Sequence, residues 1–169
     1  DVRRGVAENP NTPIALLQKL ALDKNRRDVR RGVARNPNTP KEALQQLALD
    51  EDRDVRRGVA SNPSTPEALL QQLALDENKE VAANPNTPVE ILQQLAFDKN
   101  RDVRGGVASN FNAPIALLQQ LALDEYWDVR EGVARNPNTP EALLRQLALD
   151  EDWDVLDNAE STLRKKGLL

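Results

Sequence analysis

The apolar residues of this chain recur in a pattern that predicts pairs of short helices. In the third of its units, Val55 and Val59 stand four residues apart, which places both on one face of a helix. Leu70 and Leu73 then begin a second apolar stripe at helical spacing, with two glutamines between them on the polar side. The pattern therefore predicts an all-α chain without β-strands.

A five-residue turn, Asn-Pro-Asn-Thr-Pro or a variant of it, separates the two helices of each unit. A residue that precedes proline is pushed out of the helical conformation, so the first helix is expected to end at the first asparagine. In the third unit Thr65 is then the expected N-cap of the second helix, and Pro66 its first residue. The turn recurs at residues 9–13, 36–40, 62–66, 84–88, 110–114 and 136–140.

The last prolines of these turns lie 26 or 27 residues apart, except for one interval of 22 residues. Self-similarity at such a period is the signature of a repeat array, in which each unit contacts mainly its neighbours. A helix pair of this size is too small to bury its own apolar stripe, so we expect the units to stack into an α-solenoid. We place about six two-helix repeats in residues 1–153, with units beginning near residues 1, 28, 54, 77, 102 and 128.

The last segment, residues 154–169, contains no Asn-Pro turn. Val155, Ala159 and Leu163 follow one another at four-residue spacing, and Gly167 stands where a helix C-terminus favours glycine. We expect a C-terminal capping helix that covers the apolar stripe of the last repeat.

Glycine holds the same slot of the first helix in five units, Gly58 in the third. Glycine in a helix is less favourable than alanine by ~1 kcal/mol, so the recurrence needs a reason. We expect that a side chain at this slot would keep the neighbouring helix too far away.

Two units depart from the pattern. The fourth lacks about one helical turn before Val81. The shortening is explained by a tolerated deletion, by residues missing from the sequence, or by a bend that shapes a binding face. In each case we expect the weakest stacking at this repeat. In the fifth, Ala113 replaces the capping threonine, so we expect its second helix to begin less firmly, by ~1 kcal/mol.

The sequence motif that recurs in each unit resembles that of a known family. Asp-Val-Arg-x-x-Val-Ala-x-Asn-Pro-Asn-Thr-Pro followed by x-x-Leu-Leu-x-x-Leu-Ala resembles the leucine-rich repeat variant family over residues 1–154. The resemblance implies a right-handed superhelix of α-helices that alternate with 3₁₀-helices, no enzymatic activity and a role in protein binding. Units of mostly 26 residues are longer than the family's usual repeat, which favours a fuller first α-helix and a HEAT-like array. The founding member's iron–sulfur module has no counterpart here.

Composition excludes several classes of function. The chain has no cysteine and no histidine, so it has no disulfide, no thiolate nucleophile and neither the usual general base nor the commonest metal ligand. It shows no glycine-rich phosphate loop and no nucleophile motif. We therefore predict no catalytic residues, no cofactor and no metal site. No apolar run approaches the ~20 residues of a membrane span, and no signal peptide is evident, so we expect a cytoplasmic protein.

Aromatic residues mark the candidate partner-binding surface. The residue before the aspartate of each first helix is arginine in three units but tryptophan in the last two. Exposed tryptophan beside arginine is typical of the hot spots of protein interfaces. The alternative is that the rings pack on the C-terminal helix or on a domain absent from this chain. The candidate residues are Arg101, Phe111, Tyr126, Trp127 and Trp153.

A second candidate surface is a ladder of arginines, Arg4, Arg31, Arg57, Arg104 and Arg130. It could bind nucleic acid or another polyanion. Aspartates accompany it at the same period, however, and the chain's net charge is −4, so internal charge pairing is the preferred interpretation.

From these observations we expect a non-enzymatic scaffold. Its partner is expected to be another protein, or a domain missing from this chain, since the chain has no methionine and is expected to begin partway into a repeat. Binding of nucleic acid or another polyanion through the arginine ladder is the alternative function.

Overall fold

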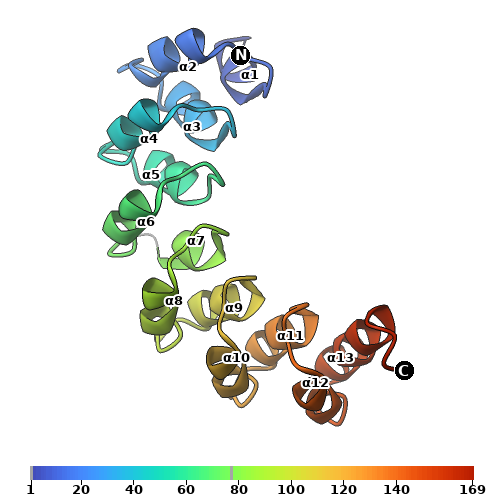
Figure 1. Cartoon of the computed structure of the whole chain (residues 1–169). Coiled ribbons are helices and arrows are strands. Elements are labelled where there is room, and N and C mark those ends of the chain that lie inside the picture. The colour runs from blue at the N-terminus through green and yellow to red at the C-terminus, as the bar shows by residue number, and fades with distance from the viewer. Residues whose placement is uncertain (1, 77) are drawn as a thin grey trace. The chain divides into compact units, whose positions relative to one another are not determined.

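The computed structural model describes residues 2–76 and 78–169, and these residues form thirteen α-helices and no strand (Figure 1). The chain divides into two compact units, Asp1–Asn86 and Thr87–Leu169. The helices of the first unit are α1 Val2–Glu8, α2 Ile14–Ala21, α3 Arg27–Arg35, α4 Lys41–Leu47, α5 Arg53–Ala60, α6 Glu67–Leu73 and α7 Asn78–Ala83. Those of the second are α8 Val89–Leu95, α9 Arg101–Ser109, α10 Ile115–Leu121, α11 Trp127–Arg135, α12 Glu141–Leu147 and α13 Trp153–Lys165.

Each of these two compact units contains several two-helix repeats and is built of two rows of helices. In the first unit α1, α3, α5 and α7 form one row and α2, α4 and α6 the other (Figure 1). In the second, α9, α11 and α13 pack one on the next, with α8, α10 and α12 in the second row. The predicted all-α solenoid of two-helix repeats is confirmed. Among the described residues, the first helix of each repeat is an α-helix and not a 3₁₀-helix.

The core consists of valines from the first helices and leucines from the second. Val55 and Val59 are completely buried, and so is Leu70. Gly58 explains the recurring glycine, because a Cβ atom built on it would lie 2.9 Å from the Cβ atom of Ala34 on the preceding first helix. A methyl group at Gly132 would likewise come within 3.0 Å of the Ala108 Cβ atom. The close approach of neighbouring first helices, predicted from the glycine slot, is therefore present.

At four of the described turns a buried asparagine joins neighbouring repeats. The Nδ2 atom of Asn62 donates to the carbonyl oxygens of Ala34 at 2.7 Å and of Asn36 at 2.8 Å, both in the preceding repeat. Its Oδ1 atom accepts from the backbone N–H of Ser64 at 2.8 Å, so the turn is closed locally as well. Asn36, Asn84 and Asn136 make the same two donations to the repeat before them. We call this set the asparagine ladder.

The threonine of the turn does not cap the second helix, so that prediction is wrong. The N-cap of α6 is Pro66, one residue later, and no side chain caps this end. The hydroxyl of Thr65 instead donates to the carbonyl oxygen of Val59, at 2.6 Å, near the end of the first helix. The same carbonyl oxygen accepts from the backbone N–H of Asn62 at 3.0 Å, so it is shared by the turn and the threonine hydroxyl. Thr139 makes the same bond to Val133.

The fourth repeat is short in the structure too. Its first helix, α7, has six residues where α9 and α11 have nine. It contacts α5 less extensively than α5 contacts α3, in line with the weak stacking expected at this repeat.

The C-terminal helix α13 packs against α11 and α12. Thr162 takes the place of the ladder asparagine, because its hydroxyl donates to the carbonyl oxygen of Ala134 at 2.8 Å. Gly167 has φ +70°, and the N–H of Leu168 donates to the carbonyl oxygen of Leu163, so glycine ends the helix as predicted. We propose that α13 caps the array.

Asn136→Ala tests the asparagine ladder. The substitution removes the side-chain donor of the carbonyl groups of Ala108 and Asn110, of which Asn110 keeps the N–H of Ala113. We expect it to lower the free energy of unfolding by about 2–4 kcal/mol, measured by urea denaturation followed by circular dichroism. Asn138→Ala is the matched control, because its amide makes an exposed bond to Phe111 and its loss should cost about 1 kcal/mol or less. Equal losses for the two variants would contradict the ladder's role.

Ala113→Thr tests the threonine bond. Ala113 is buried at the position where the other described turns bury a threonine. We expect a threonine hydroxyl here to donate to the carbonyl oxygen of Val107 and to stabilise the protein by about 1 kcal/mol, seen as a higher melting temperature. Ala113→Val has nearly the same shape without the hydroxyl and is the control. A stabilisation by valine as large as that by threonine would show that filling space, and not the bond, matters.

Candidate interaction surfaces

Buried arginine–aspartate pairs connect successive turns of each unit. The guanidinium of Arg30, on α3, binds Asp50 with two parallel hydrogen bonds of 2.6 and 3.1 Å. Its third nitrogen donates to the carbonyl oxygen of Asp23 at 2.9 Å, so one side chain joins the turns that follow α2 and α4. Arg104–Asp124 and Arg130–Asp150 repeat the arrangement in the second unit, with bonds of 2.6–2.9 Å. We call these three pairs the inter-turn forks.

The fork of Arg130 and Asp150 shifts the pKa of both its members. Hydrogen bonds from Arg130 lower the pKa of the Asp150 carboxyl, against the opposing effect of burial. The hydrogen bond to Asp150 in turn raises the pKa of Arg130. Both side chains are nearly buried. The charge of such an arginine is neutralised by its aspartate, and all three of its guanidinium nitrogens donate hydrogen bonds within the protein.

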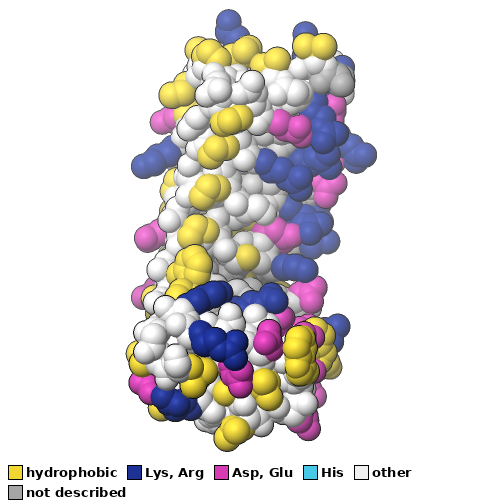
Figure 2. Space-filling view, turned by 90° about the vertical axis from the view of Figure 1, so that its right-hand side faces the viewer, with side chains coloured by type: hydrophobic (Ala, Val, Ile, Leu, Met, Phe, Trp, Pro, Cys, Tyr) yellow, Lys and Arg dark blue, Asp and Glu magenta, His cyan; other side chains and the backbone are white. Residues whose placement is uncertain are grey.

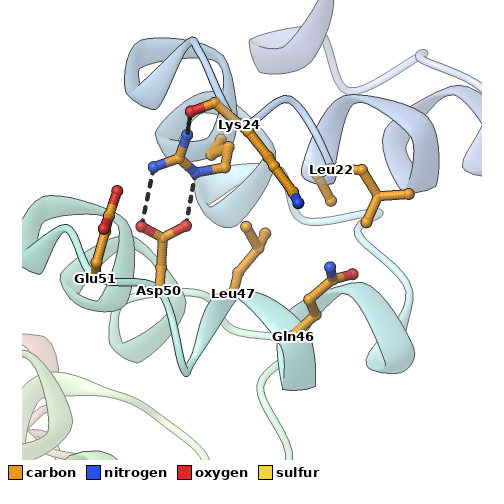
Figure 3. A pocket seen from close by; sticks show the side chains of 8 residues that line it. Leu22, Lys24, Gln46, Leu47, Asp50 and Glu51 are labelled. Atoms are coloured by element: carbon orange, nitrogen blue, oxygen red, sulfur yellow. Dashed lines mark hydrogen bonds and ion pairs between the residues drawn. The ribbon is translucent and has the colours of Figure 1, made fainter.

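A hollow lies beside each fork. In the first unit Leu22, Lys24, Gln46, Leu47 and Glu51 surround it, next to Asp50 (Figure 3). Equivalent residues line similar hollows beside Arg104 and Arg130 in the second unit.

A large apolar residue is exposed near each hollow. It directly precedes the aspartate that follows each second helix, as Leu22 precedes Asp23. The exposed fraction of this residue runs from 56% at Leu22 to 87% at Leu75. The sequence analysis missed this row. The signal was its position two residues after the last leucine of the buried stripe, which is out of step with the three- and four-residue spacing of a helical face. The row consists of Leu22, Leu49 and Leu75 in the first unit and Phe97, Leu123 and Leu149 in the second.

The candidate polyanion-binding arginines all have carboxylate partners. Arg104 and Arg130 belong to the forks. Arg4 pairs with Glu8 at 2.9 Å, Arg31 lies 3.9 Å from Asp54, and the Nε atom of Arg57 donates to Glu80 at 2.8 Å. Figure 2 shows Lys and Arg side chains in a column with Asp and Glu side chains among them. Internal charge pairing, the preferred interpretation, is therefore present, although the forks use aspartates twenty residues farther along the chain than their arginines.

Four of the five candidate partner-binding residues lie together in the second unit. Arg101, Trp127 and Trp153 are the first residues of α9, α11 and α13, which pack in that order. Trp127 is 42% exposed and Trp153 is 70% exposed, so neither ring is buried against the C-terminal helix. The ring of Tyr126 lies beneath two guanidinium groups, with the Cζ atom of Arg101 5.1 Å and that of Arg104 5.5 Å from its centroid. We call Arg101, Tyr126, Trp127 and Trp153 the aromatic row.

Phe111 lies apart from the aromatic row. It follows the C-terminal end of α9, whereas Arg101 begins that helix, and nine residues of α-helix span about 13 Å. Its side chain is 63% exposed, and its carbonyl oxygen accepts from Asn138. The structure therefore does not unite Phe111 with the other four candidates.

The described part of the chain contains no group of three or more acidic, histidine or cysteine side chains suited to a metal ion. None of the helices among these residues has the length and apolar character needed to cross a membrane.

Asp150→Asn tests the fork through pH. The variant keeps the shape but loses the charge that Arg130 binds, and we expect it to be less stable by about 2 kcal/mol near pH 7. Because the folded-state pKa of Asp150 is lowered, the difference from wild type should be complete above about pH 4 and disappear as the pH falls through that lowered pKa. Urea denaturation between pH 2 and 7 measures it. Asp154→Asn, an exposed position, is the control, and a difference that does not change with pH would contradict the prediction.

Comparisons with known proteins agree with this architecture. The model of the family described as "Leucine rich repeat variant" matches residues 27–52, 53–78 and 127–152. A solved structure described as a leucine-rich repeat variant with a novel repetitive protein structural motif is similar over 96% of this chain, with 31% identity and a TM-score of 0.62. The chain spans 65% of that protein's length.

Other comparisons are more distant. A designed armadillo repeat protein is similar over 99% of this chain and 91% of its own, with 15% identity and a TM-score of 0.40. No curated protein matches the sequence. The family model and the first solved structure agree with the helix pairs and turns described above, and the repeats at residues 27–52, 53–78 and 127–152 belong to the leucine-rich repeat variant family.

Proposed function

We propose that this chain is a non-enzymatic repeat scaffold that binds another protein through the aromatic row. The observation that carries the proposal is the exposure of two tryptophans, Trp127 and Trp153, at the same slot of two helices that pack together. An indole ring offers a large apolar area with one hydrogen-bond donor, and such rings dominate the binding energy of many protein interfaces. Two of them side by side supply a compact apolar anchor for a partner.

The fold itself does not require tryptophan at this slot. Other repeats carry Arg27, Arg53 and Arg101 there, and their first helices form equally. Trp127 keeps 42% and Trp153 keeps 70% of its surface in water, so both retain apolar area that a partner can still bury. Burial by a partner gives these rings the use that folding does not.

Binding of nucleic acid or another polyanion has less support. The inter-turn forks occupy Arg104 and Arg130, and the remaining candidate arginines also have acidic neighbours. Affinity for a polyanion rests on basic groups that can neutralise phosphates and release counterions, and these groups are already neutralised.

The test is a pull-down from lysate of the source cells with wild type and the double variant Trp127→Arg/Trp153→Arg. Arginine is the residue that other repeats carry at this slot, so we expect the fold to persist, which circular dichroism checks. A protein retained by wild type at moderate salt should be lost from the double variant. Phe97→Leu, which installs the residue of the other repeats at another exposed slot, is the matched control and should retain it.

The contrary outcome is equally definite. Capture of the same proteins by wild type and the double variant would reject the aromatic row as the binding surface. Nucleic acid captured by both and released as salt rises would favour the polyanion alternative.

A further inference from the structure

We propose that the partner presents lysine or arginine side chains, and that the site for one of them lies between Trp127 and the carboxylates of Asp152 and Asp154 at the start of α13. This inference rests on the proposed function and specifies the chemistry of the partner that the aromatic row binds.

The preceding repeat shows how a cation is held at the equivalent position. The guanidinium of Arg101, at the start of α9, lies over the ring of Tyr126, and its Nε atom is 3.3 Å from the Oδ2 atom of Asp128. Both partners belong to the next repeat. In the first unit the equivalent Arg27 lies 3.5 Å from Asp52, again in the next repeat. Arg27 and Arg101 therefore extend toward side chains at the start of the following first helix, and Arg53 donates to the carbonyl oxygen of Asp76 just before α7.

The last step of the row lacks that cation. Trp127 stands where the arginine would be, while the next repeat still supplies Asp152 and Asp154, the counterparts of Tyr126 and Asp128. Asp152 caps α13 by accepting from the N–H groups of Asp154 and Val155. Among the described residues, no lysine or arginine forms an ion pair with either carboxylate. A basic side chain from a partner would restore the pattern that Arg101 shows.

The surrounding charge suits such a partner. Residues 87–169 carry nine Lys and Arg against fourteen Asp and Glu, a net charge of −5, whereas residues 1–86 carry fourteen against thirteen. The segment from 150 to 157 has five acidic residues and no basic one. A cation over an indole face is attracted by the ring, and nearby carboxylates add to that attraction and speed association. The site is thus complementary to a basic partner.

The spacing of the rings suggests how the basic residues are arranged. Equivalent positions on packed helices lie about 8–10 Å apart. A polyproline II segment rises about 3.1 Å per residue with three residues per turn, so two side chains three positions apart lie on the same side at about 9 Å, which matches this distance. We expect the partner to offer an extended segment with two basic residues at that separation.

Tryptophan fluorescence provides a direct test, because Trp127 and Trp153 are the only tryptophans in the chain. The probe is a blocked glycine–serine peptide of about ten residues that carries two arginines three positions apart, a length that reaches both rings. Otherwise identical peptides carry two glutamates or two leucines. The arginine peptide should change the emission in a saturable way that weakens as salt rises, and the glutamate peptide should not.

Variants place the response at the site. Trp127→Arg installs the arginine of the other repeats, leaves Trp153 as the reporter and should weaken binding of the arginine peptide about tenfold. Asp154→Asn should weaken it about threefold. Glu141→Gln removes the same charge from the exposed start of α12 and should leave binding unchanged.

Two results would overturn the inference: no saturable response to the arginine peptide, or a response that Trp127→Arg and Asp154→Asn leave intact. A response to the leucine peptide alone, lost in Trp127→Arg, would reject the basic partner but leave protein binding through the aromatic row in place. Failure of the proposed function itself appears elsewhere, as equal capture by wild type and the double arginine variant in lysate.

Discussion

Two backbone carbonyl groups of one repeat meet an asparagine amide of the next, and at four of the described turns this amide donates to both of them. Asn62 donates to two carbonyl groups of the preceding repeat and accepts from its own turn, so its amide is fully used. Buried carbonyl groups left unpaired would each cost about 1–3 kcal/mol. The regular stacking of valines and leucines within each unit depends on this bond, because it sets the distance between neighbouring turns where apolar contact alone would allow sliding.

This constraint determines where the repeats can differ. The asparagines, the valines of the first helices and the glycines that allow close approach are all buried between repeats, and substitutions there disturb the stack. The slot before the first-helix aspartate and the residue before the turn aspartate are exposed, so they can vary without loss of the fold. Arg101, Trp127 and Trp153 show such variation at the first slot, and Phe97 among leucines at the second. Candidate function lies on the surface because the interior is committed to stacking.

Much of the architecture could be predicted from local pattern. Val55 and Val59 at four-residue spacing, and asparagine before proline, defined the helix pairs and their turn. Gly58 indicated close approach of helices, and Gly167 the end of the last one; both predictions are confirmed. The failure is also informative. Thr65 carries the usual sequence signal of an N-cap, yet its hydroxyl donates to the carbonyl oxygen of Val59, because the folded turn brings the two together and a carbonyl oxygen can accept a second bond besides that from Asn62.

The sequence by itself determined the period, the helix pairs, the family and the list of unusual residues, since each of these follows from spacing along the chain. The tertiary structure decided which residues meet. It pairs Arg104 with Asp124 instead of an aspartate closer in sequence, and it separates Phe111 from the aromatic row. It also leaves a leucine or phenylalanine exposed before the aspartate that follows each second helix. These outcomes depend on how one repeat packs on the next, because the spacing of residues along the chain shows that they recur but not which of them come into contact.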